Sequence, residues 1–188
     1  GKIVWEYKEP FSGEFAVRGP GNVNFGHATF RVSRIPPDAP ALQGRDLKPL
    51  DPQPQTIAER AGVKAKVPRG LRYHSDKVTP GYVMYNPILS DTIYLLNNDG
   101  KVVHMWKSEY TPSGGLYFKE NGNLLRPARN IDLKGFKGGG QGGRIQELAP
   151  DGTVLWDWEY ATEEHLSHHD IEPLPNGNIL VLAWESKT

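Results

Sequence analysis

The side chains best suited to acid–base or anion chemistry lie together near the C-terminal end, in the segment His165-Leu-Ser-His168-His169-Asp170. A neutral imidazole can accept a proton from a phenol, and an imidazolium can donate hydrogen bonds to the oxygens of an anion. We therefore take His168 and His169 as the candidate catalytic residues. Arg126 and Arg144 are further cationic donors, and we take them as candidate substrate-binding residues.

Two other interpretations of this segment stay open. In the first, one of the paired histidines is a packed structural residue bonded to Asp170. In the second, the histidines and the aspartate bind zinc, for which they are acceptable ligands. Neighbouring residues of a strand do not converge easily on one ion, so we predict no metal site, and we predict no cofactor. Because alternate residues of a strand point to opposite faces, we expect His169 in particular to face the ligand.

The composition limits the class of protein. The chain has 188 residues, 22 Lys+Arg against 22 Asp+Glu, and no cysteine. The length suits about one domain, and the lack of cysteine excludes disulfides, thiolate metal sites and a cysteine nucleophile. The sequence has no run of ~18 apolar residues, which excludes a transmembrane helix. Lys and Arg are spread through a chain of zero formal charge, so nucleic acid is not an expected partner.

Turn signals recur through the second half of the chain. Gly (21) and Pro (16) are abundant, which favours many short strands over a helical bundle. Asp-Gly occurs at 99–100 and 151–152, and Asn-Gly occurs at 121–122 and 176–177, spacings of 52 and 55 residues. Both dipeptides favour tight turns between antiparallel strands. Two hairpins in about 50 residues are typical of a four-stranded β-propeller blade.

The sequence therefore predicts an all-β fold that is part of a propeller, with about two to two and a half blades of four-stranded antiparallel sheet. The expected strands are Tyr82–Tyr85, Thr92–Leu96, Val102–Trp106, Leu116–Phe118, Leu124–Arg126, Arg144–Leu148, Val154–Tyr160, Ile171–Leu174 and Ile179–Trp184. The five tryptophans (5, 106, 156, 158 and 184) recur at equivalent places, which indicates packing between blades. A ring typically needs four to eight blades, so the missing blades must come from the same protein or from another chain.

The first 62 residues differ from residues 63–188, and we place a boundary near Gly62. A strand at Ile3–Tyr7 precedes a proline-rich stretch, which we interpret as an extended tail because proline cannot donate to a ladder. Residues 57–61 favour one helical turn. Propellers commonly close by pairing strands from both chain ends, so we expect Ile3–Tyr7 to join the blade formed between Tyr82 and Trp106. The glycine-rich segment 134–144 favours a flexible or close-packed loop over a phosphate cradle.

Several segments resemble the opening blades of the bacterial arylsulfotransferase family. The most specific is His168-His-Asp-Ile-Glu-Pro-Leu-Pro-Asn-Gly-Asn-Ile-Leu180, and the others are Tyr94–Trp106, Gly139–Glu147 and Asp151–Trp158. The resemblance covers about residues 70–188. It implies a six-bladed propeller in the periplasm or outside the cell, which moves sulfate from an aryl sulfate to a phenol through a transiently sulfated histidine.

Residues 1–48 resemble the closing, C-terminal segment of the same family, so the order is permuted and the middle blades are absent. The family's sulfated histidine would fall in those middle blades. The resemblance therefore implies that His169 acts on the sulfuryl group as a hydrogen-bond donor rather than as the nucleophile. The expected partners are small aryl sulfates and phenols. The alternative is a noncatalytic propeller module used for binding or assembly.

Overall fold

The computed structural model describes residues 1–11, 16–17, 23–24, 29–64, 68–130, 136 and 139–187. The fold is all-β, as predicted. The strands are β1 (Trp5–Lys8), β2 (Ala16–Val17), β3 (Val23–Asn24), β4 (Thr29–Ile35), β5 (Gly70–His74), β6 (Tyr82–Pro87), β7 (Thr92–Leu96), β8 (Val102–Lys107), β9 (Tyr117–Phe118), β10 (Leu124–Arg129), β11 (Gly143–Leu148), β12 (Val154–Glu159), β13 (His165–Pro173) and β14 (Ile179–Glu185). A short 3-10 helix spans Pro40–Leu42, and α1 spans Ile57–Arg60.

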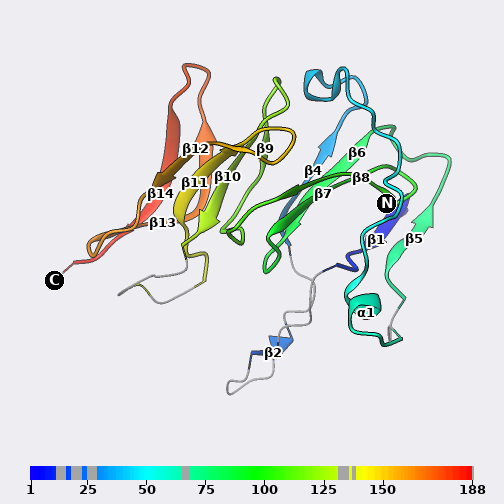
Figure 1. Cartoon of the computed structure of the whole chain (residues 1–188), viewed down its shortest axis with the longest axis horizontal. Helices are drawn as coiled ribbons and strands as arrows, with labels where there is room; N and C mark the ends of the chain where they lie inside the picture. Colours follow the sequence, from blue (N-terminus) through cyan, green and yellow to red (C-terminus); the bar gives the residue numbers. More distant parts are fainter. Residues whose placement is uncertain are drawn as a thin grey trace.

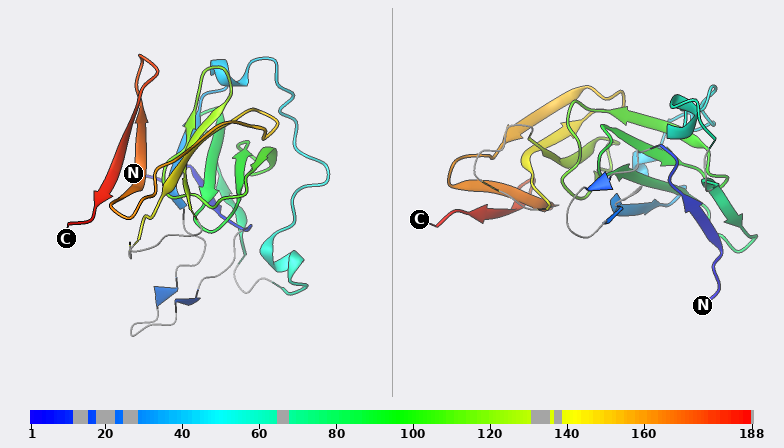
Figure 2. Two further views of the ribbon diagram at one scale, coloured as in Figure 1. Left: turned by 60° about the vertical axis from the view of Figure 1, so that its left-hand side comes forward. Right: turned by 90° about the horizontal axis from the view of Figure 1, so that it is seen from below.

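Two four-stranded antiparallel sheets form the centre of the molecule (Figure 1). Sheet 1 has the order β4-β6-β7-β8, and sheet 2 has the order β9-β10-β11-β12. The hairpin β13–β14 lies beside sheet 2, and the two-stranded sheet β1–β5 lies on the far side of sheet 1, so that the sheets follow one another in an arc (Figure 2). A further hairpin pairs β2 with β3.

The four predicted Asx-Gly turns share one geometry. Their glycines, at 100, 122, 152 and 177, have φ between 69° and 89°, a conformation that a side chain would strain. In each turn the residue before the loop donates its amide to a carbonyl four residues on. The bonds are Asn97 to Lys101 (3.0 Å), Lys119 to Asn123 (2.9 Å), Ala149 to Thr153 (2.8 Å) and Leu174 to Asn178 (2.8 Å). The repeated dipeptides thus set four equivalent hairpins.

The sheets pack face to face through apolar layers. Sheet 1 contributes Ile93 and Trp106 to the layer that it shares with Leu124 and Leu148 of sheet 2. A second layer joins sheet 2 to the β13–β14 hairpin, through Leu125, Ile145, Ile171, Ile179 and Val181. The outer face of sheet 1 is covered by β1, with Trp5 and Tyr7 against Val83, Tyr85, Tyr94 and Leu96. Because sheet 1 is buried on both faces, β7 is an unbroken apolar run instead of an alternating one.

The strand that completes sheet 1 is β4, and not the segment Ile3–Tyr7 as predicted. Strand β4 pairs antiparallel with β6, whereas β1 pairs with β5 and contacts sheet 1 only through its side chains. The sequence interpretation includes residues 30–35 in the extended tail because of the prolines that follow them. Those prolines begin at Pro36, after the last ladder residue Ile35, so they end the strand without interrupting it. Two strand pairs, β4–β6 and β1–β5, therefore join residues 1–62 to residues 63–188.

A helical turn is present where the sequence predicts one. The helical turn α1 begins with a capping box, in which Thr56 and Glu59 bond each other's backbone. Of the glycine-rich segment 134–144, residues 134–135 and 137–138 lie outside the described residues. Among the helices that the structure describes, none has the length and apolar character needed to cross a membrane.

Candidate functional site

The edge strands β4, β9 and β13, one from each of three successive sheets, meet at one place. Arg31 of β4 forms an ion pair with Asp170 of β13, and its guanidinium lies 5.2 Å from the ring centre of Tyr117 on β9. The Tyr117 hydroxyl donates to Asp170 Oδ1 (2.9 Å) and contacts the carbonyl of Ile171. Side-chain contacts thus link three strands that are far apart in sequence, beside His169.

His169 lies in a bulge of β13. The pairing with β14 shifts register between Ser167 and Ile171, which leaves residues 168–170 outside the ladder. His169 has φ 58°, and within the described part of the chain no other non-glycine residue has a positive φ. Such a conformation costs about 1–3 kcal/mol and persists only where the surroundings impose it. Residues of this kind cluster at binding and catalytic sites.

Two glycines make room for His169. A Cβ atom on Gly114 would overlap the His169 carbonyl, and one on Gly140 would overlap the imidazole ring. The His169 amide also donates to the Gly140 carbonyl at 2.8 Å. The backbone of Gly114 and the backbone of Gly140 therefore lie against His169 on two sides and fix its position.

The site is lined by stacked rings. The imidazole of His169 stacks on Phe30 of β4 (centroids 5.0 Å apart, planes 20° apart) and lies 4.3 Å from the imidazole of His168. His168 in turn lies 3.9 Å from Trp184 of β14. The premise that neighbouring residues point to opposite faces fails here, because the positive φ of His169 rotates its side chain beside that of His168.

The polar atoms of the two histidines differ in their partners. His168 Nε2 donates to the Gly139 carbonyl at 3.2 Å. His169 Nδ1 is buried and has no hydrogen-bond partner among the residues that the structure describes. Buried polar atoms are nearly always bonded, and an exception calls for an explanation such as a ligand or a change of state. Asp170 is bonded to Arg31 and Tyr117 rather than to either ring, which is not the packing suggested by the structural interpretation.

The electrostatics of the site follow from this arrangement. The hydrogen bond to Tyr117 and the Asp170 charge raise the pKa of Arg31, so its charge is secure. Burial, together with the bond to Asp170, raises the pKa of the Tyr117 hydroxyl and keeps it neutral. Partial burial and the neighbouring His169 lower the pKa of His168, which favours its neutral form. The site therefore holds one fixed cation paired with Asp170, one neutral hydroxyl bonded to Asp170, and two imidazoles.

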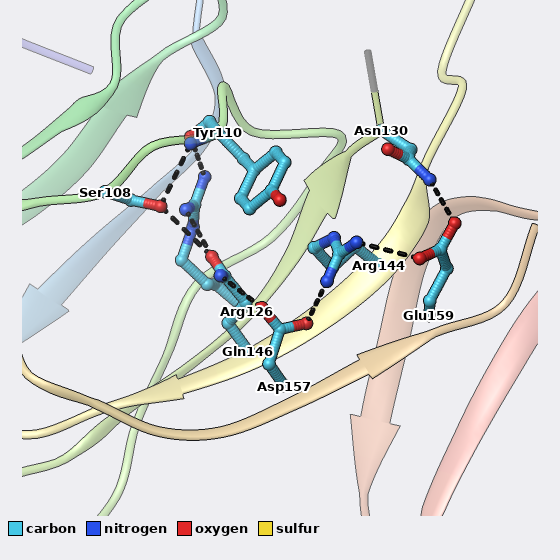
Figure 3. Close-up of polar contacts among 8 residues, drawn as sticks. All are labelled: Ser108, Tyr110, Arg126, Asn130, Arg144, Gln146, Asp157 and Glu159. Atoms are coloured by element: carbon cyan, nitrogen blue, oxygen red, sulfur yellow. Dashed lines mark hydrogen bonds and ion pairs between the residues drawn. The ribbon is translucent and has the colours of Figure 1, made fainter. Parts of the chain in front are cut away.

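Arg126 is buried within sheet 2. It is 0 % exposed, within sheet 2, where it donates to Gln146 Oε1 (3.2 Å) and to the Tyr110 carbonyl (2.9 Å) (Figure 3). Ser108 donates to the same Gln146 oxygen at 3.0 Å. Burial lowers the pKa of Arg126 to about 10. The hydrogen bonds of Arg126 are therefore made to other residues of the protein interior.

Arg144 faces carboxylates of the neighbouring strand. It donates to Asp157 Oδ1 (2.6 Å) and Glu159 Oε2 (2.9 Å) on β12, and its guanidinium lies 4.6 Å from the ring centre of Tyr110 (Figure 3). Burial alone would lower its pKa, but the bond to Asp157 prevails and raises it. Two carboxylates of β12 therefore already neutralise this cation.

The remaining histidines stand apart from the cluster. His104 lies in sheet 1 beside Trp106 and donates through Nε2 to the Pro150 carbonyl (2.8 Å). His74 lies 3.9 Å from Asp99, and His27 lies outside the described residues. Within the described ranges, no three His, Asp or Glu side chains are grouped as a metal would require.

The sequence interpretation missed Arg31, Phe30 and Tyr117. The sequence interpretation puts the first two in a tail and gives Tyr117 only a place in a strand. A usable signal is the alternation of apolar and polar residues in Phe30-Arg-Val-Ser33, which is typical of a strand. Comparison with protein-family models, with curated proteins and with solved structures finds no match for this chain.

Proposed function

We propose that this chain is part of a β-propeller of the arylsulfotransferase type, which binds an aryl sulfate and transfers its sulfuryl group to a phenol. In this proposal the three edge strands β4, β9 and β13 are the inner strands of successive blades, and the remaining blades come from the same protein or another chain. Periplasmic or extracellular location belongs to the same proposal.

The observation that carries the proposal is the state of His169. It combines a positive φ with a buried ring nitrogen that has no partner among the described residues. Both features cost free energy in the folded chain, and both are typical of residues that a ligand or a reaction requires. The flanking Arg31 guanidinium carries N–H groups besides the one bonded to Asp170, and these are the donors proposed for the anion.

The ring stacking supports an aryl substrate. Phe30 is 44 % exposed and already carries one planar ring, that of His169. An aryl sulfate placed here has an aromatic surface beside its ring and an imidazole beside its sulfuryl group. Offset stacking of this kind contributes about 0.5–1.5 kcal/mol beyond the buried area.

The proposed reaction proceeds in two steps. In the first, a neutral histidine nitrogen in the blades beyond this chain forms a bond to sulfur, the bond between sulfur and the aryl oxygen breaks, and the aryl group leaves as a phenolate. In the second, the phenol oxygen attacks sulfur, the sulfur–nitrogen bond breaks and the phenol proton passes to a base. His169 holds a sulfuryl oxygen in both steps, and neutral His168 is suited to accept the phenol proton.

The test compares His169→Ala with the unaltered protein. Equilibrium binding of 4-nitrophenyl sulfate to this chain should weaken at least roughly tenfold, because a hydrogen bond to a charged group is lost. In the protein with all its blades, release of 4-nitrophenolate should slow by ~10²–10³-fold, the usual effect of removing one preorganised donor. Mass mapping should still find a sulfated histidine elsewhere.

His165→Asn is the matched control, because His165 lies on the same strand and stacks on Tyr160 (5.9 Å), away from Phe30. It should bind 4-nitrophenyl sulfate as the unaltered chain does. Equal binding by His169→Ala and the unaltered chain would reject the role of His169. Sulfate found on His169 itself would make it the nucleophile. Absence of any aryl sulfate binding would favour the noncatalytic module.

A further inference from the structure

Residues 108–116 connect β8 of sheet 1 to β9 of sheet 2, and we call them the connecting segment. They form no regular strand, but backbone hydrogen bonds hold them along β10. The bonds run from the Arg129 amide to the Thr111 carbonyl (2.9 Å) and from the Ser113 amide to the Pro127 carbonyl (3.3 Å), beside an isolated bridge between Pro112 and Ala128. Strand β10 therefore sets the path of the connecting segment.

Arg126 of β10 and Gln146 of β11 hold the beginning of the connecting segment (Figure 3). Arg126 donates to the Tyr110 carbonyl (2.9 Å) and to Gln146 Oε1 (3.2 Å). Ser108 donates to the same Gln146 oxygen (3.0 Å). The Gln146 amide group in turn donates to Asp157 Oδ2 (2.9 Å), which fixes the orientation of its Oε1. The two buried side chains therefore fix Ser108 and Tyr110 relative to sheet 2.

The end of the connecting segment lies against the bulge that contains His169. A Cβ atom on Gly114 would overlap the His169 carbonyl, and one on Gly115 would lie 2.6 Å from Asp170 Oδ1. Tyr117, which directly follows the segment, donates to that same Asp170 oxygen at 2.9 Å. Consecutive residues of the connecting segment therefore contact consecutive residues of the bulge, and neither glycine has room for a side chain.

Stability does not explain an arginine at position 126. The side chain is 0 % exposed, and the acceptors of its hydrogen bonds are uncharged carbonyl oxygens. Burial lowers its pKa to about 10, so the charge disfavours folding at neutral pH. Well-packed apolar residues often replace a buried ion without loss of stability. What Arg126 provides, and an apolar residue of similar volume does not, is a fixed donor for the Tyr110 carbonyl.

We propose that Arg126 is a positioning residue for His169 and acts through the connecting segment. Its guanidinium fixes the Tyr110 carbonyl, and the hydrogen bonds along β10 keep the residues that follow in place. Gly114 and Gly115 then hold the bulge in its observed position. The inference rests on the function proposed for His169, and it gives Arg126 a part in that function without contact to the substrate.

The first test compares Arg126→Met with the unaltered chain and needs no ligand. We expect the amides of Ser113 and Arg129 to exchange hydrogen at least about tenfold faster, because the connecting segment loosens when Tyr110 loses its donor. The imidazole signals and the backbone carbon shifts of His169 in NMR spectra should change as well. Unchanged exchange, or faster exchange with unchanged His169 signals, overturns the proposal.

Binding of 4-nitrophenyl sulfate supplies the second test. Arg126→Met should weaken it about 2- to 30-fold, the usual range for a residue that acts on a site from a distance. In a chain that already carries His169→Ala, Arg126→Met should have no further effect, since a positioning residue acts only through the residue that it positions. Equal losses in the two backgrounds would overturn the proposal, because Arg126 would then affect binding by another route.

Arg45→Met is the matched control. Arg45 also donates to two backbone carbonyls, those of Ala41 (2.7 Å) and Gly122 (2.8 Å), but it does so at the turn between β9 and β10. This variant should leave the His169 signals and aryl sulfate binding unchanged. Changes as large as those in Arg126→Met would show a general loosening of the sheet and would reject the specific role of Arg126.

Gly115→Ala disturbs the same path without altering Arg126, and it serves where Arg126→Met fails to fold. The added Cβ atom presses on Asp170, so the His169 signals should change, and unchanged signals count against the proposal. The two proposals fail in different ways. If the unaltered chain does not bind 4-nitrophenyl sulfate, the proposed function fails, and the exchange and NMR results alone decide whether Arg126 positions His169.

Discussion

Arg31 and Asp170 form an ion pair between β4 and β13, although 139 residues separate them in the chain. Tyr117 of β9 donates to the same carboxylate. These contacts therefore link sheet 1, sheet 2 and the β13–β14 hairpin at one point, beside the bulge that contains His169.

A double-mutant cycle should measure this link. We expect Arg31→Ala and Asp170→Asn to be coupled by about 1–2 kcal/mol in the free energy of unfolding, because both groups are charged and in contact but partly exposed. The coupling should shrink in 1 M salt, which screens exposed charges. Urea unfolding of the four proteins measures it. Fully additive effects would contradict the link.

Gly140→Ala should disturb His169, and Gly177→Ala should not. Both glycines have positive φ (75° and 86°), so both substitutions strain the backbone by about 1–2 kcal/mol. A Cβ atom at Gly140 meets the His169 ring, whereas at Gly177 nothing lies within 4 Å. We expect the greater loss of stability for Gly140→Ala, together with a changed His169 imidazole signal in NMR spectra. Equal losses would show that the ring moves aside freely.

His169→Asn should separate folding from function. Asparagine tolerates the left-handed region better than other residues, so stability should change by less than about 1 kcal/mol. A β-branched residue does not tolerate it, and we expect His169→Val to cost about 2 kcal/mol more. Aryl sulfate binding should weaken at least about tenfold in both variants. Thermal unfolding and binding measured together distinguish the two effects.

Arg126 should tolerate an apolar residue of similar volume. Its folded pKa of about 10 lies below its ordinary value of 12.5, so burial of the charge disfavours folding at neutral pH, and stability should rise as pH increases above 10. Arg126→Met should therefore change stability by less than about 1.5 kcal/mol. Arg126→Ala should cost about 2–5 kcal/mol because it leaves a cavity. Urea unfolding compares the two variants.

His104 should contribute to acid sensitivity. Burial lowers its pKa in the folded chain, so the unfolded chain takes up a proton first as pH falls through the ordinary histidine range. Stability should therefore decrease as pH falls from neutral toward 5. His104→Gln keeps a donor for the Pro150 carbonyl and should flatten this slope. Unfolding midpoints at pH 7.5 and 5.5 check the prediction, and an unchanged slope would assign the sensitivity to other groups.

The parts of the fold that depend on local signals could be predicted from the sequence. Asp99-Gly100 and Asn176-Gly177 favour their turns without help from distant residues, and the flanking runs are apolar enough to be strands. Strand β7 was predicted with the bounds that the structure gives. Strand β4 was not predicted, because its partner β6 lies 47 residues away and nothing in its own composition specifies that pairing.

The site was predictable only in part, for the same reason. The segment His168–Asp170 was recognised because its residue types are suited to chemistry. The positive φ of His169 depends on the space left by Gly114 and Gly140, which lie in the segments before β9 and β11. Burial of Arg126 depends on the stacking of sheets on both sides of β10. Neither property has a sequence signal at the residue itself.

The pairing of β4 with β6 has a consequence for the order of folding. Sheet 2 consists of successive strands, so it can form hairpin by hairpin with short loops, whereas sheet 1 must close the span from Ile35 to Tyr82. Closing a flexible loop of 47 residues costs about 3 kcal/mol of chain entropy plus a constant. Sheet 2 is then the natural nucleus, and β4 joins late. Arg31, and with it the complete site, would assemble among the last elements of the molecule.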